Sequence, residues 1–406
     1  MIFNSFVFLV FIALFFPLYF GTRGRARLWV ILVASYVFYG WWDVRFLGLI
    51  VFSTLMDGWF GLWLSYLDKP EETQRNWQQG SWVARWFGQL TLLTASFGLP
   101  RKTVLIFSMV MNLGFLGVFK YFNFFAEGFA HLVTAMGMTP SWTTLKILLP
   151  VGISFYTFQS VGYMVDVYRG KSAPEQHFGY FALFVAYWPQ LVAGPIERYH
   201  HIGPQLHATQ KLEYDNFANG FRLIILGFFA KMVVADNLAV LVNQFYENPI
   251  GYGRRDAALA LVSYSFQIYC DFYGYSLIAI GSARLMGVRL ADNFRTPYLA
   301  SSVAEFWQRW HISLSTWFRD YLFIPLGGSR VGLARWAFNA MVVFTVSGFW
   351  HGARWTFVIW GAAWGLFYVA EKFLGKLIPE SKHDTVKDAV KTWTFFKTLR
   401  IPLIFG

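Results

Sequence analysis

The chain has 406 residues, of which 56% are hydrophobic and only 14% are charged. A soluble globular domain usually carries about a quarter charged residues, so this composition excludes an ordinary soluble enzyme. The net charge of +12 would suit an anionic partner such as nucleic acid. The cytoplasmic loops of membrane proteins also carry an excess of Lys and Arg, and we therefore predict no nucleic-acid partner.

The first apolar segment, residues 3–20, is followed rather than preceded by basic residues. A cleavable signal peptide has its positive charges before the apolar region, so we predict an uncleaved span. Basic residues beside a span favour the cytoplasmic side of the membrane. We expect Arg23, Arg25 and Arg27 in the cytoplasm and the N-terminus outside.

Apolar segments long enough to cross a bilayer recur along the chain, which predicts an all-α, polytopic membrane protein of about ten spans. In chain order the predicted spans are 3–20, 28–41, 46–67, 103–124, 145–165, 178–195, 217–243, 257–287, 334–347 and 349–373.

Two polar segments interrupt these spans. Residues 68–102 are expected to form a cytoplasmic loop with an aromatic-rich interfacial piece, Trp77 to Phe87. Residues 376–393 precede a short apolar tail, FFKTLRIPLIFG. No repeat of fixed period and no low-complexity linker divides the sequence, so we predict one membrane domain over residues 1–406.

Glycine and proline break several apolar segments, in LPVGISF (149–155), VAGPIER (192–198) and PLGGSR (325–330). Inside a bilayer, broken backbone is tolerated only where it is buried in protein or lines a cavity. The breaks indicate either a central tunnel with re-entrant elements or turns at the ends of spans. The 85 aromatic residues exceed what interfacial belts need, so we expect some of them to line an internal cavity.

An imidazole and a guanidinium, His351 and Arg354, stand inside the apolar run from Phe338 to Ala370. An ionisable side chain at bilayer depth costs a few kcal/mol and marks a functional site by default. Desolvation and the neighbouring guanidinium both favour a neutral imidazole, which is the form that acts as a general base. The alternative is a histidine that only donates a hydrogen bond to a neighbouring helix.

If this segment is a continuous helix, Ser347, Arg354 and Trp355 share a face with His351. Gly348 and Gly352 then form a groove of small residues beside that face. Such a groove lets another helix or a ligand approach the backbone closely.

A second candidate region runs from Ser302 to Phe323. Its apolar residues recur at steps of three and four, which predicts one amphipathic helix in the interface or over a wet cavity. The apolar face comprises Phe306, Trp307, Trp310, Leu314, Trp317, Phe318 and Tyr321, and the polar stripe comprises Gln308, His311, Ser315 and Arg319. Taken alone, His311 is interpreted as a surface histidine. The arginines beside it would suit an anionic ligand and lipid headgroups equally well.

Asp271 lies in a third region, the apolar run SYSFQIYCDFYGYSLIAIG (263–281). It is either a site residue or a hydrogen-bond acceptor that holds helices together. The sequence contains no GxSxG, no GxxxxGK[ST] and no HExxH motif. The pair His200–His201 lacks acidic or cysteine ligands at metal spacing, so we predict no metal.

These segments together resemble the membrane-bound O-acyltransferase family, in the bacterial branch of alginate O-acetyltransferases and related polysaccharide- or cell-wall-acetylating proteins. The resemblance covers about residues 31–370 and is carried by LLPVGISFYTFQSVGYMVDVYRG, WPQLVAGPIER, EFWQRWHISLSTWFRDYLFIPLGGSR and GFWHGARWTFVIWG. The chain departs from the branch in reading CDFYGYSLIA where relatives tend to read FDFSGYSDMA, and it has a longer 68–102 loop. Its C-terminus is shorter than the branch usually has, so we expect a truncated chain.

The resemblance implies a bacterial inner-membrane enzyme with a ring of helices around a tunnel. It assigns catalysis to His351, with His311 on the cytoplasmic side. It also implies acetyl-coenzyme A or another acyl thioester as donor substrate, no permanently bound cofactor, a polysaccharide acceptor and an extracytoplasmic transferase or esterase-like partner. We add three donor-side candidates, which are Arg309, Ser315 and Arg319. Further tunnel candidates are Trp350, Arg354, Asp271 and Gln308. A transporter of polysaccharide, lipid or acyl carrier without covalent chemistry is the alternative, because broken helices and midplane charges suit transporters too.

Overall fold

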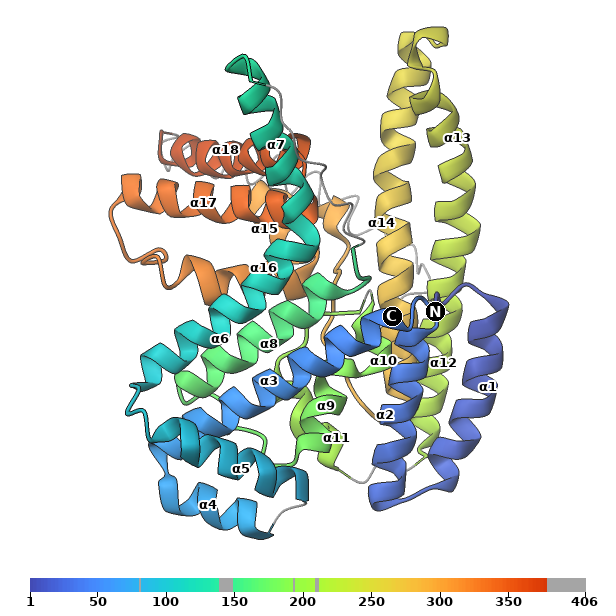
Figure 1. Ribbon diagram of the computed structural model, residues 1–406. Coiled ribbons are helices and arrows are strands. Elements are labelled where there is room, and N and C mark those ends of the chain that lie inside the picture. The colour runs from blue at the N-terminus through green and yellow to red at the C-terminus, as the bar shows by residue number, and fades with distance from the viewer. Residues whose placement is uncertain (80–81, 139–148, 193, 209–211, 378–406) are drawn as a thin grey trace. The chain divides into compact units, whose positions relative to one another are not determined.

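The computed structural model describes residues 1–79, 82–138, 149–192, 194–208 and 212–377 (Figure 1). All regular secondary structure in these ranges is helical, which confirms the predicted all-α class. The chain divides into two compact units, Met1–Asn293 and Phe294–Gly406. The single membrane domain stays a prediction.

Four helical stretches among the described residues are long and apolar enough to cross a membrane: Arg45–Asp68, Arg101–Ala135, Tyr214–Glu247 and Trp355–Gly375. They agree with a multi-pass membrane protein, whereas the count of about ten spans stays a prediction. The start of the predicted span 145–165 lies outside the described residues, as does the C-terminal tail.

The first unit contains most of the helices. In chain order they are α1 (Phe6–Gly21), α2 (Gly24–Gly40), α3 (Arg45–Asp68), α4 (Pro70–Gln79), α5 (Trp82–Ala95), α6 (Arg101–Leu116), α7 (Phe122–Ala135), α8 (Ile153–Tyr168), α9 (Phe178–Ala186), α10 (Trp188–Leu191), α11 (Tyr199–His207), α12 (Tyr214–Phe228), α13 (Asp236–Glu247) and α14 (Arg254–Leu285). Two π-helical turns, η1 (Gly117–Tyr121) and η2 (Phe229–Ala235), join α6 to α7 and α12 to α13.

The core of this unit contains a cluster of aromatic rings around Trp188, which is fully buried in α10. Its indole lies 5.3–5.9 Å from the rings of Phe8, Phe11 and Phe15 of α1 and of Phe38 of α2. Many of the aromatic residues therefore pack between helices, where ring contacts contribute about 0.5–1.5 kcal/mol beyond area burial.

Glycines set the contact between α12 and α14, which lie side by side in Figure 1. A Cβ atom on Gly227 would lie 2.7 Å from the carbonyl oxygen of Gly274, and one on Gly220 would lie 2.8 Å from that of Gly281. The two pairs are spaced seven residues apart on both helices. Small residues at this spacing let the backbones approach closely.

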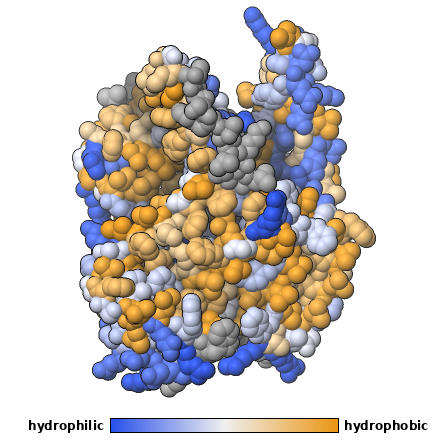
Figure 2. All heavy atoms as spheres, viewed as in Figure 1, coloured by the Kyte–Doolittle hydropathy of each residue, from blue (hydrophilic) through white to orange (hydrophobic). Residues whose placement is uncertain are grey.

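The predicted loop 68–102 is largely helical. It folds into α4 and α5, and Trp77 and Phe87 pack with Leu62 of α3 in a small apolar cluster. Figure 2 shows blue, hydrophilic spheres gathered at the lower edge of the molecule, where Figure 1 places α4, below a broad orange surface. The cytoplasmic location and the interfacial position of this segment stay predictions.

The predicted breaks in the apolar segments are confirmed as breaks between helices. Gly152, in LPVGISF, has φ +77° at the start of α8, and a Cβ there would lie 2.7 Å from the carbonyl oxygen of Leu191. Only glycine meets both requirements at little cost.

The second unit contains α15 (Val303–Arg309), α16 (Ile312–Phe318), the π-helical turn η5 (Arg319–Phe323), α17 (Leu333–His351) and α18 (Trp355–Leu377). Helices α17 and α18 pack against each other along their length. Gly348 of α17 meets Gly361 of α18, where a Cβ on Gly348 would lie 2.8 Å from the Cα of Gly361. The groove predicted at Gly348 is therefore occupied by a helix.

Candidate active site

His311 lies at a break between two helices, so the prediction of one continuous amphipathic helix over 302–323 is wrong. Helix α15 ends at Arg309 and α16 begins at Ile312, and His311 between them adopts the left-handed conformation with φ 42° and ψ 56°. Histidine tolerates this region better than most residues. The break turns the imidazole into the protein, where the residue is only 2% exposed, so it is no surface histidine.

His351 is the last residue of α17, so the condition of a continuous helix through it is not met. Gly352 is extended, with φ −164° and ψ 143°, and α18 begins at Trp355. Arg354 and Trp355 therefore do not share a helical face with His351, and both are exposed in this unit. Ser347, one turn earlier in α17, does share that face.

The two breaks bring the predicted catalytic histidines together. The ring centroids of His311 and His351 are 6.4 Å apart, and the indole of Trp350 lies 6.1 Å from His311. Trp360 packs edge-on against His351 at 5.4 Å. Burial, together with the neighbouring His351, lowers the pKa of His311 well below its usual value. At neutral pH the His311 imidazole is therefore uncharged.

A cavity of about 380 Å³ lies within the same unit. Neither histidine lines it, but Leu314, about one turn after His311, and Ser347, one turn before His351, do. Its wall contains Gln308, Ser315 and Arg319 of the predicted polar stripe, and Ser347 of α17. Aromatic and aliphatic side chains form most of the remaining wall: Trp307, Leu314, Phe318, Phe323, Val343, Phe344 and Tyr368. Aromatic residues thus line this cavity, whereas an internal tunnel stays a prediction.

Arg309 does not belong to this wall. Its guanidinium pairs with Glu305 one turn earlier in α15. Hydrogen bonds from Ser301 and the nearby guanidinium lower the pKa of Glu305 to about 2. Glu371 of α18 accepts hydrogen bonds at 2.9 and 3.1 Å from the backbone N–H groups of Val303 and Ala304. This cap ties the start of α15 to α18, and sequence spacing gave no sign of it.

Asp271 belongs to the first unit, where it takes part in an ion-pair cluster. Lys231 Nζ lies 2.6 Å from Asp271 Oδ1 and 2.6 Å from Asp236 Oδ1, and so links α14 to the helix that follows η2. Tyr275, one turn further along α14, donates a hydrogen bond to Asn4. The contacts support the reading in which Asp271 holds helices together.

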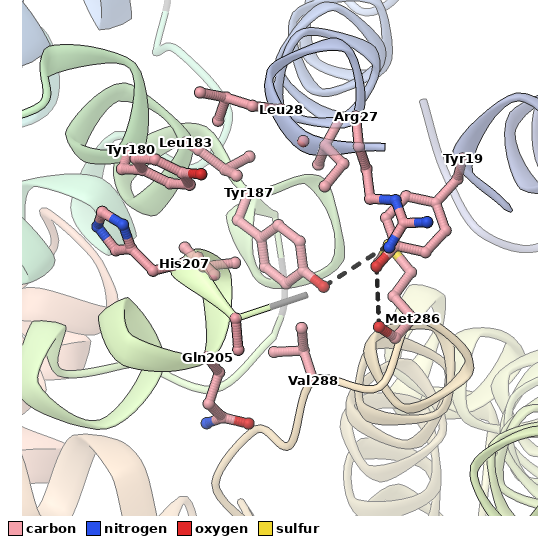
Figure 3. Close-up of a pocket in the computed structure, with 14 residues that line it drawn as sticks. Tyr19, Arg27, Leu28, Tyr180, Leu183, Tyr187, Gln205, His207, Met286 and Val288 are labelled. Carbon is pink, nitrogen blue, oxygen red and sulfur yellow. Dashed lines mark hydrogen bonds between the residues drawn. The ribbon is translucent and has the colours of Figure 1, made fainter. Parts of the chain in front are cut away.

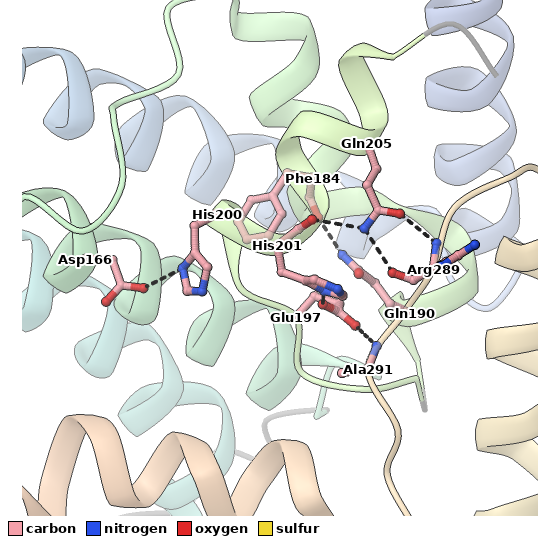
Figure 4. Close-up of polar contacts among 9 residues, drawn as sticks. All are labelled: Asp166, Phe184, Gln190, Glu197, His200, His201, Gln205, Arg289 and Ala291. Atoms are coloured by element: carbon pink, nitrogen blue, oxygen red, sulfur yellow. Dashed lines mark hydrogen bonds and ion pairs between the residues drawn. The ribbon is translucent and has the colours of Figure 1, made fainter.

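Polar contacts that no sequence motif indicated surround the segment 197–207 (Figure 4). Glu197 Oε2 lies 2.7 Å from His201 Nδ1, and this hydrogen bond raises the pKa of His201. Glu197 also accepts a hydrogen bond from the N–H of Ala291. The neighbouring His200 faces Asp166 at 3.5 Å. His200 therefore links the chain after the VAGPIER break to α8, and Glu197 links it to the segment after α14.

A small cavity of about 50 Å³ lies beside these contacts (Figure 3). The figure shows Tyr187 between Tyr19 with Arg27 on one side and His207 on the other. Arg27 stacks over the Tyr19 ring at 4.8 Å, and Tyr19 donates a hydrogen bond to the carbonyl oxygen of Met286. The cavity is thus walled by contacts that anchor the turn between α1 and α2.

His207 also contacts Glu175, with Nε2 2.6 Å from Oε2. Burial raises the pKa of Glu175, but hydrogen bonds with His207 and Tyr199 outweigh it and hold that pKa below its usual value. Across the described ranges, no group of three or more His, Cys, Asp or Glu side chains is placed to hold a metal ion.

The motifs and the histidine geometry agree with a comparison against known families. The model of MBOAT, the membrane-bound O-acyltransferase family, matches residues 175–405, which include both histidines. The chain belongs to the membrane-bound O-acyltransferase family.

Individual relatives show which acyltransferases within the family the chain is similar to. The chain is 40% identical over 379 residues to a probable alginate O-acetylase AlgI of Pseudomonas aeruginosa, covering 92% of this chain and 66% of the relative. It is 37% identical over 406 residues to the corresponding protein of Pseudomonas putida, covering 98% and 77%. It is 34% identical over 366 residues to a peptidoglycan O-acetyltransferase of Helicobacter pylori, covering 84% and 63%. These relatives are acyltransferases, as predicted, and the chain spans about two thirds of their length.

Proposed function

We propose that the chain transfers an acyl group, most simply acetyl, from a thioester donor to a hydroxyl group. The transfer serves the O-acylation of an envelope or exported polysaccharide. This proposal rests on the pairing of His311 and His351, each about one turn from a residue that lines a cavity of about 380 Å³. The names of the relatives support the acetyl group, since they include an alginate O-acetylase and a peptidoglycan O-acetyltransferase.

His351 acts as the general base in the proposed reaction. A neutral imidazole accepts the proton of the attacking hydroxyl while the oxygen bonds to the thioester carbonyl carbon. The carbon–sulfur bond then breaks, and the proton passes to the departing thiolate. The apolar wall of Leu314, Phe318 and Val343 strengthens polar interactions with the carbonyl by lowering the local dielectric.

The cavity offers suitable groups for the thioester donor, which we propose to be acetyl-coenzyme A. The pantetheine arm of coenzyme A combines an apolar chain with amide groups. Trp307 lines the cavity with a buried indole N–H that lacks a hydrogen-bond partner among the described residues, and Gln308 adds an amide. Arg319, whose side chain is 59% exposed, would favour the phosphates.

His311 is proposed to orient this donor. Replacing it with alanine should therefore weaken binding of a non-reactive coenzyme A analogue, whereas His351→Ala should leave that binding intact. Titration calorimetry on the purified protein measures both. His311→Asn is the matched control for the backbone, because asparagine also tolerates the left-handed conformation. It should lose donor affinity without loss of thermal stability.

Other results would contradict this assignment. If both alanine variants bind the analogue as the wild type does, and only acceptor affinity falls in His311→Ala, the proposed division of labour is wrong. If the wild type binds no acyl thioester, the non-enzymatic transporter becomes the better hypothesis.

We further propose about ten spans in the bacterial inner membrane, with the N-terminus outside and a separate extracytoplasmic protein that completes the transfer. The arginines that follow α1 support this orientation. After Cys270, the only cysteine, is replaced by serine, single cysteines placed near Arg25 or within 69–79 should be labelled only from the cytoplasmic side. Labelling near Arg25 from outside alone would reverse the topology.

A further inference from the structure

Ser347 stands out among the groups on the cavity wall because its hydroxyl is available. Several helical hydroxyls elsewhere in the protein donate to the carbonyl oxygen four residues earlier, as Thr54, Thr91 and Thr316 do at 2.7–2.8 Å. Ser347 makes no such bond, nor any other hydrogen bond to the part of the chain that the structure describes. Its oxygen therefore faces the cavity unengaged.

Ser347 also lies within reach of the candidate base. It precedes His351 by four residues in α17, so the two side chains share one face with Cβ atoms roughly 5–6 Å apart. Helical side chains lean toward the N-terminus, which directs the imidazole of His351 over the turn that carries Ser347. A hydroxyl with a base in this relation is the usual arrangement of an activated nucleophile.

Other hydroxyls of the cavity wall fit this role less well. Ser315 donates its proton to the carbonyl oxygen of Trp310 at 3.2 Å. Ser329 is exposed in the turn after η5, and Tyr368 belongs to the middle of α18, far in sequence from both histidines. Ser347 alone among these combines a free oxygen with a place one turn from His351.

We propose that Ser347 is a covalent relay, which holds the acyl group as an ester between donor and acceptor. This inference rests on the proposed acyl transfer. A relay suits a reaction whose donor and acceptor reach the site from opposite sides of a membrane, because the two need not be bound together. The apolar neighbours Val343 and Phe344 would keep water from hydrolysing the ester.

The relay consists of two balanced steps. The Ser347 oxygen attacks the thioester carbonyl carbon, His351 takes the hydroxyl proton, and the carbon–sulfur bond breaks as that proton passes to the thiolate. The products are an acyl-serine ester and a free thiol. The acceptor hydroxyl then attacks the ester, and His351 moves the acceptor's proton to the Ser347 oxygen, which regenerates the serine.

The direct test is the detection of an acyl ester on the wild-type protein. Purified wild-type protein is incubated with acetyl-coenzyme A labelled in its acetyl group, without acceptor, and then quenched in acid. We expect stoichiometric label that hydroxylamine releases, with one acetyl group on the peptide containing Ser347 by mass spectrometry. Ser347→Ala and His351→Ala should not be labelled, and Ser347→Ala should lower acetylation of the polysaccharide roughly 10²-fold or more.

Thr345→Ala is the matched control, because it removes a hydroxyl two residues away on the same helix and outside the cavity wall. It should be labelled as the wild type is. If Ser347→Ala acetylates the acceptor at the wild-type rate and no label is found on Ser347, transfer is direct and the relay is wrong while the proposed function stands. If wild-type protein neither binds nor consumes the thioester, both proposals fail.

Discussion

Replacing His351 with alanine should abolish acyl transfer while the protein still inserts and folds. The imidazole ends α17, one turn after the cavity-lining Ser347, and its ring centroid lies 6.4 Å from that of His311; we propose it as the group that accepts the proton of an attacking hydroxyl. Removing a general base typically lowers the rate by about 10²–10⁴-fold. Acetylation of the exported polysaccharide, in cells that express the variant at the wild-type level, measures the effect.

The control for this variant separates chemistry from packing. His351 packs against Trp360, so His351→Gln, which keeps a polar group of similar size, should preserve thermal stability and remain inactive. Near-wild-type acetylation by either variant would exclude His351 as the catalytic base.

Replacing Gly348 with a larger residue should destabilise the second unit. A Cβ at this position would lie 2.3 Å from the carbonyl oxygen of Phe357 and 2.8 Å from the Cα of Gly361, both of which are backbone atoms that cannot move aside alone. Overpacking of this kind costs about 1–3 kcal/mol for small additions. Gly348→Leu adds a larger side chain, so we expect no folded, monodisperse protein to be recovered in detergent.

Gly375→Ala is the matched control, because it lies in α18 with nothing within 4 Å of the added Cβ. Alanine is favoured over glycine in a helix by about 1 kcal/mol, so this variant should melt at or above the wild-type temperature. Thermal unfolding followed by size-exclusion chromatography compares the two. Equal melting temperatures for Gly348→Ala and the wild type would show that α17 and α18 do not approach as closely as described.

The class of fold and the two candidate catalytic histidines could be predicted from the sequence. Apolar length alone indicates membrane helices, because the hydrocarbon core demands about 20 apolar residues from each one. An imidazole in an apolar run singles out His351, since an idle ionisable group there would be costly. Small residues at Gly348 predicted a close approach of another helix, and α18 makes it.

How these residues meet depends on tertiary contacts, which leave no periodic pattern in the sequence. Periodicity reports which face of a helix a residue occupies, but it does not report where the helix breaks. The helices break at His311 and Gly352, and two histidines forty residues apart lie together at these breaks. Arg309 pairs with Glu305 and does not line the cavity, because its side-chain rotamer directs it there. Sequence spacing does not predict that rotamer. The cap of α15 by Glu371 joins residues nearly seventy positions apart, and contacts at that separation leave no local pattern in a sequence.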